Sequence, residues 1–366
     1  MIKRKTYKYR IYPTKAQETS LYRTLNTCRL IYNKTLEIRK KTYENEKKAV
    51  SYIDTVKLLT QWKKSDIALE TIHSQVLQDV QKRVDIAFQN FFRRIKKGEN
   101  PGYPRFKRWD RYDSFTYPQS GFKLGNNFLK LSKIGNVKLV NSRQLQGKIK
   151  TLVIRRSSTN KWFACFACEI ELEPKQVSPA KIVGVDLGLL HLATLTDGTH
   201  IPNPKWYRQE EKELAKAQSK KKNKKVISRI NERIKNKRNN YLHHISTNIV
   251  KNYDIICLEK LKIKGMLGFS KGLNKSFNDT ALYQLTQMIV YKAEEAGKYT
   301  ILVDPKNTTK KCSQCGKLVE KDLSERIHNC PFCELKIDRD LNAARNILAL
   351  GLQSLGKNLK SSIHLE

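Results

Sequence analysis

Hydrophobic and polar residues alternate along the start of the chain and then recur at helical spacing. Residues 2–12 alternate and are rich in tyrosine and isoleucine, which predicts a β-strand. Pro13 ends this strand, and Thr14 with Gln17 forms the pattern of a capping box at the start of a helix. From there to about Lys97 the apolar positions follow a helical period, as in Leu21, Leu25, Cys28 and Ile31 and again in Val76, Val80, Val84, Ala87 and Phe91. The pattern predicts one strand followed by a helical insertion.

The pattern changes after the helical region. Residues 98–120 mix proline, glycine, aromatic and basic residues, and short alternating segments follow, namely FLKLSKI, VKLVN, KTLVIRR and KWFACFACEIEL. Together with residues 2–12 as the first strand, these segments predict a small β-barrel interrupted by the helices. Residues 173–181 contain proline and serine as linkers often do, so we place a domain boundary there.

The second half of the chain contains two apolar strands that end in acids. The segment KIVGVDLG ends near Asp186, and LATLTDGTHI predicts a hairpin that turns at Asp197-Gly198. Residues 205–240 hold fourteen Lys and Arg against four Asp and Glu, which predicts one or two charged helices that are either simply solvated or in contact with nucleic acid. A further helix is expected before DIICLEKL, a second buried strand that ends at Glu259.

Charge then narrows the class of partner. The chain has 72 Lys and Arg against 34 Asp and Glu, a net charge of +38, which favours binding to a polyanion and points to nucleic acid. Its 366 residues suggest two or three domains, and 39% apolar residues suffice for a core. No apolar stretch has the length of a membrane span or of a signal peptide, so we expect a cytoplasmic protein.

Four of the eight cysteines form two CxxC pairs. Cys312 and Cys315 are followed, after fourteen residues, by Cys330 and Cys333, which is the spacing of a tetrahedral zinc site. Four thiolates leave no open coordination position, so the predicted Zn²⁺ is structural. The other four cysteines lie in apolar or aromatic segments and are expected to be small buried residues.

Three acids are candidates for a second, catalytic metal site. Asp186 and Glu259 end apolar strands, and Asp340 begins a helix; singly, each could be a solvated acid or a helix cap. An RNase H-like fold brings acids from such positions together, where two Mg²⁺ ions about 4 Å apart can act on a phosphodiester. Of the two aspartates at the helix start, we prefer Asp340 to Asp338 as the metal ligand because Asp340 immediately precedes the apolar run.

These segments together resemble the TnpB family of RNA-guided nucleases encoded by insertion-sequence transposons. GVDLGLLHLATLTDG resembles the first RuvC motif and IICLEKL the second, while KCSQCG, CPFC and DRDLNAARNI resemble the zinc ribbon inserted before the third. Upstream, YKYRIYPTKAQ, CRLIYNKTL, SQVLQDV, FFRRIK and PGYPRFKRWDRYDSFTY resemble the N-terminal blocks of the family. The resemblance covers nearly the whole chain.

The resemblance implies a mixed α/β architecture in which an RNase H-like RuvC domain with an inserted zinc ribbon follows a wedge β-barrel interrupted by a helical recognition domain. The corresponding boundaries are 1–13 and 103–178 for the barrel, 14–102 for the recognition domain, 179–304 for the first part of RuvC, 305–336 for the ribbon, and 337–366 for the last RuvC helix and tail.

It further implies an endonuclease that binds a transposon-derived guide RNA and cuts double-stranded DNA, with one protein copy per RNA. Asp186, Glu259 and Asp340 would hold two Mg²⁺ ions, for which Mn²⁺ could substitute. Ser74, Gln75 and Gln78 would read bases beside the target, and Arg326 would contact the scissile strand; an ordinary polar surface is the alternative for each. The rival functions are a guided DNA-binding repressor that does not cut, which the retained acids disfavour, and a DNA-joining transposase, which the position of the ribbon disfavours.

Overall fold

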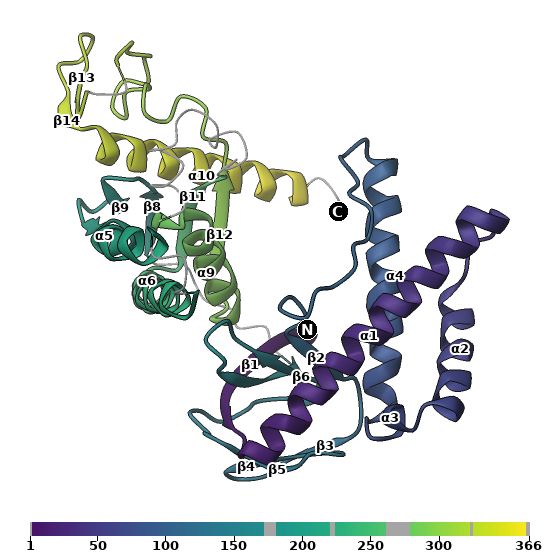
Figure 1. Cartoon of the computed structure of the whole chain (residues 1–366). Helices are drawn as coiled ribbons and strands as arrows, with labels where there is room; N and C mark the ends of the chain where they lie inside the picture. Colours follow the sequence, from purple (N-terminus) through teal and green to yellow (C-terminus); the bar gives the residue numbers. More distant parts are fainter. Residues whose placement is uncertain (1, 172–180, 220–223, 261–278, 323–324, 364–366) are drawn as a thin grey trace. The chain divides into compact units, whose positions relative to one another are not determined.

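The protein is described by a computed structural model that covers residues 2–171, 181–219, 224–260, 279–322 and 325–363 (Figure 1). The chain divides into two compact units, Met1–Leu172 and Glu173–Glu366. The linker expected at residues 173–181 lies, apart from Lys181, outside the described residues. Within the described ranges, no helix is both long enough and apolar enough to cross a membrane.

The first unit contains a seven-stranded sheet that curls into a nearly closed barrel, as the alternating segments predicted. Its order is β2-β6-β7-β1-β5-β4-β3, and β1 pairs antiparallel with β7 along nearly its whole length. The short strands β2 and β3, which lie at the two edges of the sheet, were not predicted. Strand β2 lies inside the mixed stretch 98–120, and β3 follows directly after it. The strands are β1 Ile2–Tyr12, β2 Ser114–Tyr117, β3 Phe122–Leu124, β4 Phe128–Leu131, β5 Gly135–Leu139, β6 Lys148–Arg156 and β7 Trp162–Glu171.

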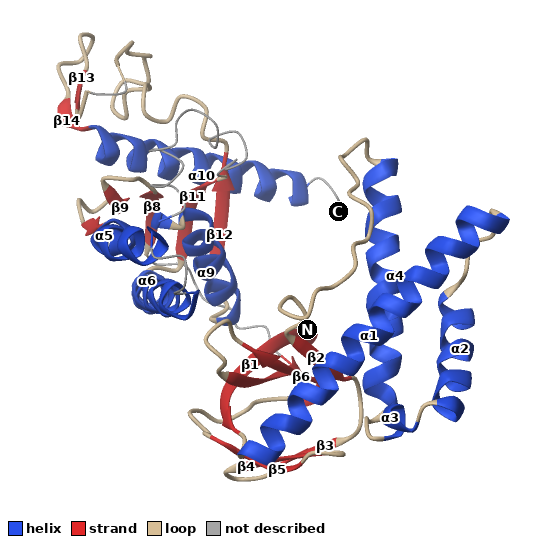
Figure 2. Cartoon of the chain, in the orientation of Figure 1, coloured by secondary structure: helices blue, strands red, loops and turns tan. Residues whose placement is uncertain are grey.

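The predicted helical insertion lies between β1 and β2 (Figure 2). Thr14 caps the first helix as expected, because its hydroxyl accepts from the Gln17 amide while the Gln17 side chain accepts from the Thr14 amide. The apolar stripes of the first and last helices pack into one core with the inner face of the barrel, so the insertion and the barrel fold as one body. The helices are α1 Lys15–Glu46, α2 Tyr52–Ser65, α3 Ile67–Glu70 and α4 Ser74–Lys96.

The second unit is built on a mixed five-stranded sheet of order β10-β9-β8-β11-β12. The predicted hairpin is present, with Gly198 at a φ of 87° in the turn between β9 and β10. Strands β8, β11 and β12 are parallel to one another. The strands are β8 Ile182–Asp186, β9 His191–Leu195, β10 His200–Pro202, β11 Ile255–Glu259 and β12 Tyr299–Val303, and a separate small ladder joins β13 Ile327–Asn329 to β14 Lys336–Asp338.

Helices cover both faces of this sheet. Val183 and Val185 of β8 pack with α6 Lys224–Asn252 and α9 Leu282–Glu295 in one core. The opposite face carries α10 Arg339–Ile363. One expectation was wrong here: α6 is a single helix running to β11, so no further helix precedes that strand. The segment from Gly351 to Ile363 belongs to α10.

Two glycines allow α10 to lie directly on the sheet. A Cβ atom on Gly184 of β8 would come within 2.2 Å of the Ala344 carbonyl oxygen, and one on Gly351 within 2.2 Å of the Cys257 sulfur of β11. Either contact would force the helix away from the strand. The absence of a side chain at these positions therefore sets the height of α10 above β8 and β11.

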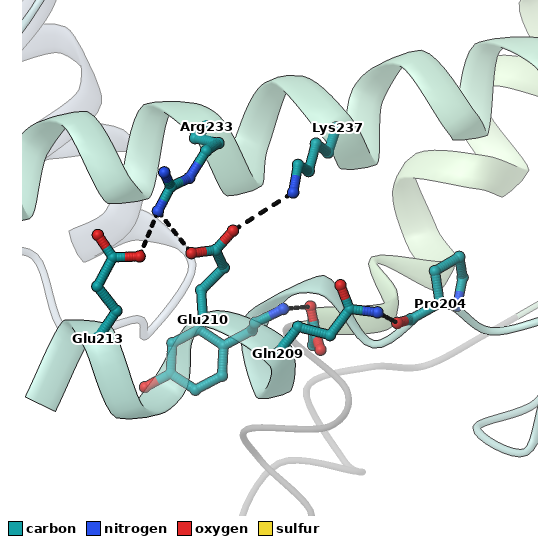
Figure 3. Close-up of polar contacts among 8 residues, drawn as sticks. Pro204, Gln209, Glu210, Glu213, Arg233 and Lys237 are labelled. Atoms are coloured by element: carbon teal, nitrogen blue, oxygen red, sulfur yellow. Dashed lines mark hydrogen bonds and ion pairs between the residues drawn. The ribbon is translucent and has the colours of Figure 1, made fainter.

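The predicted basic segment forms a hairpin of α5 Trp206–Ser219 and α6, whose acids pair within it (Figure 3). The Arg233 guanidinium bonds the carboxylates of Glu210 at 2.6 Å and Glu213 at 2.5 Å, and Lys237 lies 3.4 Å from Glu210. Lys and Arg outnumber Asp and Glu in this segment, so many of the basic side chains are not neutralised by an acid of the hairpin. These basic side chains give the hairpin a positive surface.

Candidate functional site

Three acids from separate elements face the same side of the second sheet. Parallel pairing of Val185 with Leu258 places Asp186 and Glu259 at adjacent strand ends. Since side chains alternate along a strand, Asp186 lies on the same face as Gly184, the residue against α10. Asp340 lies one helical turn before Ala344, the residue that covers Gly184. Close packing of α10 thus brings the third acid to the first two.

Burial acts on the carboxyls of Asp186 and Glu259, and the charges of the neighbouring acids act on Asp186 as well. The three side chains belong to residues only 8–9% exposed. The pKa of Asp186 is raised well above its ordinary value, first by burial and then by the charges of Glu259 and Asp340, while Arg339 partly opposes the shift. Burial also raises the pKa of Glu259. A buried carboxylate with other acids near it is typical of a site that can bind a hard cation.

A buried threonine orients the glutamate. The Thr308 hydroxyl donates to Oε1 of Glu259 at 2.5 Å and opposes the rise in the pKa of that carboxyl. The Asn346 amide of α10 in turn donates to the carbonyl oxygens of Thr308 at 2.8 Å and Lys311 at 2.6 Å. Asn342, one turn earlier, also bonds the Lys311 carbonyl and accepts from the Ser313 amide. Helix α10 therefore clamps the turn that holds Glu259.

The two aspartates at the start of α10 have separate positions. The helix begins at Arg339, and Asp338 is its cap: its Oδ1 accepts from the amides of Asp340 at 2.9 Å and Leu341 at 3.0 Å. We had expected Asp340 to stand at the very start of the helix. Instead, it lies inside the first helical turn. Its carboxylate is 3.3 Å from the Arg339 guanidinium, which also bonds the Glu325 carbonyl.

Arg326 lies beside the loop that follows Asp186. It lines a pocket of about 300 Å³ together with Leu189, Lys205 and Arg208. Its carbonyl oxygen accepts from the Arg339 amide at 2.9 Å, which ties this segment to the start of α10. The described lining of the pocket holds three cations and one acid, Asp279, so positive charge predominates, which favours contact with a phosphate.

The four cysteines of the two CxxC pairs converge. Their sulfur atoms all lie within 4.8 Å of one another, and the Cys312–Cys333 and Cys315–Cys330 pairs are each 3.6 Å apart. Four sulfurs at this separation fit the ligand shell of one tetrahedral zinc ion. The cluster can therefore hold Zn²⁺.

The candidate base-reading residues lie in the first turns of α4. Ser74 accepts from the Lys63 ammonium at 2.6 Å, and the Gln75 side-chain oxygen accepts from the amide and hydroxyl of Ser120 at 3.0 and 3.1 Å. Gln78, three residues later, is exposed. The structure thus orients Gln75 and leaves Gln78 at the surface of the first unit.

Sequence reasoning missed the supporting residues of the site. Thr308 gives no local signal because nothing in its neighbourhood indicates contact with Glu259. Asn342 and Asn346 did give one: two amides four residues apart interrupt the apolar face of a helix, and both are buried. Buried amides need partners, so this spacing could have predicted a polar contact across the helix.

Comparison with known proteins identifies the family. Family models described as "Helix-turn-helix domain", "Probable transposase" and "Cas12f1-like, TNB domain" match residues 1–48, 165–270 and 283–347. A "Putative RNA-guided DNA endonuclease" of Streptomyces pristinaespiralis is 34% identical over 95% of this chain and 90% of its own length. A "TnpB-like protein" of Acanthamoeba polyphaga mimivirus is 24% identical over 94% of this chain and 73% of its own length. The chain belongs to the TnpB family.

A second curated relative agrees with this membership. The "Putative RNA-guided DNA endonuclease InsQ" of Escherichia coli is 30% identical over 94% of this TnpB-family chain and 92% of its own length. A solved "Cas12f1-sgRNA-target DNA complex" covers 94% of this chain and 99% of its own with 16% identity, and its TM-score of 0.37 is too low to support a conclusion.

The helix-turn-helix description does not fit residues 2–48, which form a strand and one long helix.

Proposed function

We propose that this protein is an RNA-guided DNA endonuclease that hydrolyses phosphodiesters at Asp186, Glu259 and Asp340. The observation that carries the proposal is the meeting of three buried acids from β8, β11 and α10 on one face of the sheet. The proposal assigns the second unit to RuvC with its zinc ribbon, and the barrel and helices of the first unit to the wedge and recognition domains.

The acids suit two Mg²⁺ ions, with Mn²⁺ as a substitute, because their mutual repulsion is relieved by hard cations with oxygen ligands. Bound there, these ions would polarise the phosphodiester and offset the negative charge that develops during hydrolysis. The chain itself orients the ligands: Thr308 occupies one oxygen of Glu259 and leaves the other for a cation. Arg339 fixes Asp340 by an ion pair at 3.3 Å.

The nucleic-acid partners in this proposal are a guide RNA from the transposon end and a double-stranded target, bound by one protein copy. The net charge of +38 and the positive α5–α6 hairpin favour such polyanions. Gln78 can pair with an adenine edge beside the target. Gln75, whose side-chain oxygen already accepts from Ser120, keeps its amide hydrogens to donate to a base, and Ser74 lies next to it. Arg326, in its basic pocket, would contact the scissile strand. Base pairing with the guide would supply the remaining specificity.

A library cleavage assay tests the proposal. The protein is expressed with the transcript that spans its 3′ flank, then mixed with magnesium and plasmids that carry a guide-matched target beside randomised bases. Cut products should share a short motif next to the target, and cutting should require the RNA. Guided binding without cutting would indicate a repressor, and joined rather than cut ends would indicate a transposase.

The two aspartates at the start of α10 should behave differently when replaced. Asp340→Ala should abolish cleavage while leaving guided DNA binding intact, because it removes a metal ligand. Asp338→Ala should lower stability by about 1 kcal/mol through loss of the cap, and Asp338→Ser should restore it, since serine caps helices well. Cleavage rates and melting curves of the three variants check this. Loss of cleavage in Asp338→Ser, with Asp340→Ala active, would reverse the assignment.

A further inference from the structure

A second pocket lies in the first unit, far along the chain from the acids. It has a volume of about 300 Å³, at the small end for ligand pockets, with room for one planar ring of nucleobase size. Its walls include Tyr32 of α1, Ile86, Ala87 and Asn90 of α4, and Lys107 and Arg111 of the connection from α4 to β2. The one acid among the lining residues that the structure describes, Asp113, is paired with Arg155 at 3.2 Å. Among the described residues, the Asn90 amide has no hydrogen-bond partner, so it can pair with a base edge.

The connection that closes this pocket is held in place although residues 99–113 contain no helix or strand. Asn33 of α1 binds the backbone of Lys107 in both directions, donating to its carbonyl at 3.0 Å and accepting from its amide at 2.7 Å. At the other end, the Arg94 guanidinium donates to the Pro101 carbonyl at 2.9 Å. These bonds preorganise the connection, which lowers the entropic cost of binding a ligand.

The same connection presents large aromatic rings to solvent. Trp109 is 71% exposed and Phe106 is 52% exposed. Lys107 and Arg108 lie between these two rings, and Arg111 follows Trp109 by two residues. Asp110, the one acid between residues 103 and 111, is paired with Arg108 at 3.4 Å. Aromatic rings between cations on a fixed backbone are the components of a stacking surface for unpaired nucleotides.

We propose that the pocket between α1, α4 and residues 103–111 binds an unpaired nucleotide of the guide RNA. The base enters against Tyr32 and Ile86 and pairs with Asn90, the neighbouring base stacks on Trp109, and Lys107 with Arg111 contacts the phosphates. The proposal rests on the proposed function. RNA is favoured over the proposed double-stranded target because folded RNA displays unpaired bases that stack on aromatic side chains, whereas a duplex keeps its bases paired.

Equilibrium binding of the 3′-flank transcript to the full-length protein tests the site. Trp109→Ala and Asn90→Ala should each raise the Kd by about 10-fold or more, while Trp109→Phe should stay within about 3-fold because it keeps a stacking ring. Tyr43→Ala is the matched control: Tyr43 is 57% exposed on α1 but does not line the pocket, and its loss should leave the Kd unchanged. Transcripts containing 4-thiouridine should crosslink to peptides that contain residues 103–111.

The outcomes separate this site from the function itself. If the parent protein does not bind the transcript, the proposed guided function fails, and this inference fails with it. If the parent binds and Trp109→Ala and Asn90→Ala bind equally well, only the pocket assignment is wrong. Crosslinks at residues 103–111 from 4-thiothymidine in target DNA, with none from the RNA, would overturn the choice of RNA.

Discussion

Asp186→Asn should eliminate DNA cleavage by the RNA-loaded protein while leaving binding to the guide and the target unchanged. Mutation of a residue that only hydrogen-bonds to a metal ligand typically lowers activity about 10–100-fold. Mutation of the ligand itself should therefore lower the cleavage rate by more than about 100-fold. The measurement is the single-turnover cutting rate of a matched plasmid, with target binding assayed in parallel.

The same substitution should stabilise the protein in the absence of magnesium. The folded state raises the pKa of Asp186, so the ionised carboxylate disfavours folding at pH values above the unfolded pKa, and stability increases as the pH falls through the raised pKa. Asparagine carries no charge and removes this cost at neutral pH. Without magnesium, we therefore expect the melting temperature of Asp186→Asn to exceed that of the parent by at least about 2 °C.

Asp197 offers a control of opposite sign. Burial raises its pKa, but the Tyr253 hydroxyl and the Thr199 amide bond its carboxylate and make the net shift downward. Asp197→Asn should therefore lower the melting temperature at neutral pH while leaving cleavage intact. A destabilised Asp186→Asn protein, or one that still cuts, would contradict the assignment of Asp186 to a charged metal site.

Removing the predicted zinc should also stop cleavage, because the ribbon is joined to Glu259. Cys330→Ser should lose the single zinc ion, measured by elemental analysis, and should lose most of its cleavage activity. The link runs from the Cys312 knuckle, through the Asn342 and Asn346 bonds, to the turn that contains Thr308. Cys165→Ser is the matched control, since Cys165 lies in β7 outside the cluster and should keep both zinc and activity.

Thr308 provides a separate test of that link. Thr308→Val should retain zinc but cut about 10-fold more slowly and require more magnesium, as expected when a partner that orients a metal ligand is lost. Thr308→Ser keeps the hydroxyl and should restore both values. Normal magnesium dependence in Thr308→Val would show that the ribbon does not act through Glu259, and full activity in zinc-free Cys330→Ser would contradict the coupling itself.

Local sequence patterns were sufficient for features that depend on neighbouring residues. The alternation at residues 2–12, the Thr14 capping box and the two apolar runs that end at Asp186 and Glu259 all correspond to observed elements. The spacing of the cysteines predicted their convergence because each CxxC pair is itself a local turn. The patterns failed to predict short elements such as β2 and β3. They also divided the single helix α6 into two expected helices.

Features that join distant parts of the chain were decided only by the tertiary structure. The local pattern distinguishes Asp338 from Asp340 only by their distance from the apolar run. Which of them caps the helix depends on where α10 begins, and packing against β8 and β14 sets that start. The contact of Thr308 with Glu259 spans 49 residues, and the clamp by Asn346 spans 38. The sequence by itself determined the first strand and its helix cap, the two strands that end in acids, the cysteine spacing and the candidate acids, since these depend on short-range propensity and periodicity. The tertiary structure decided which acids meet, because that depends on how closely α10 approaches the sheet at Gly184 and Gly351.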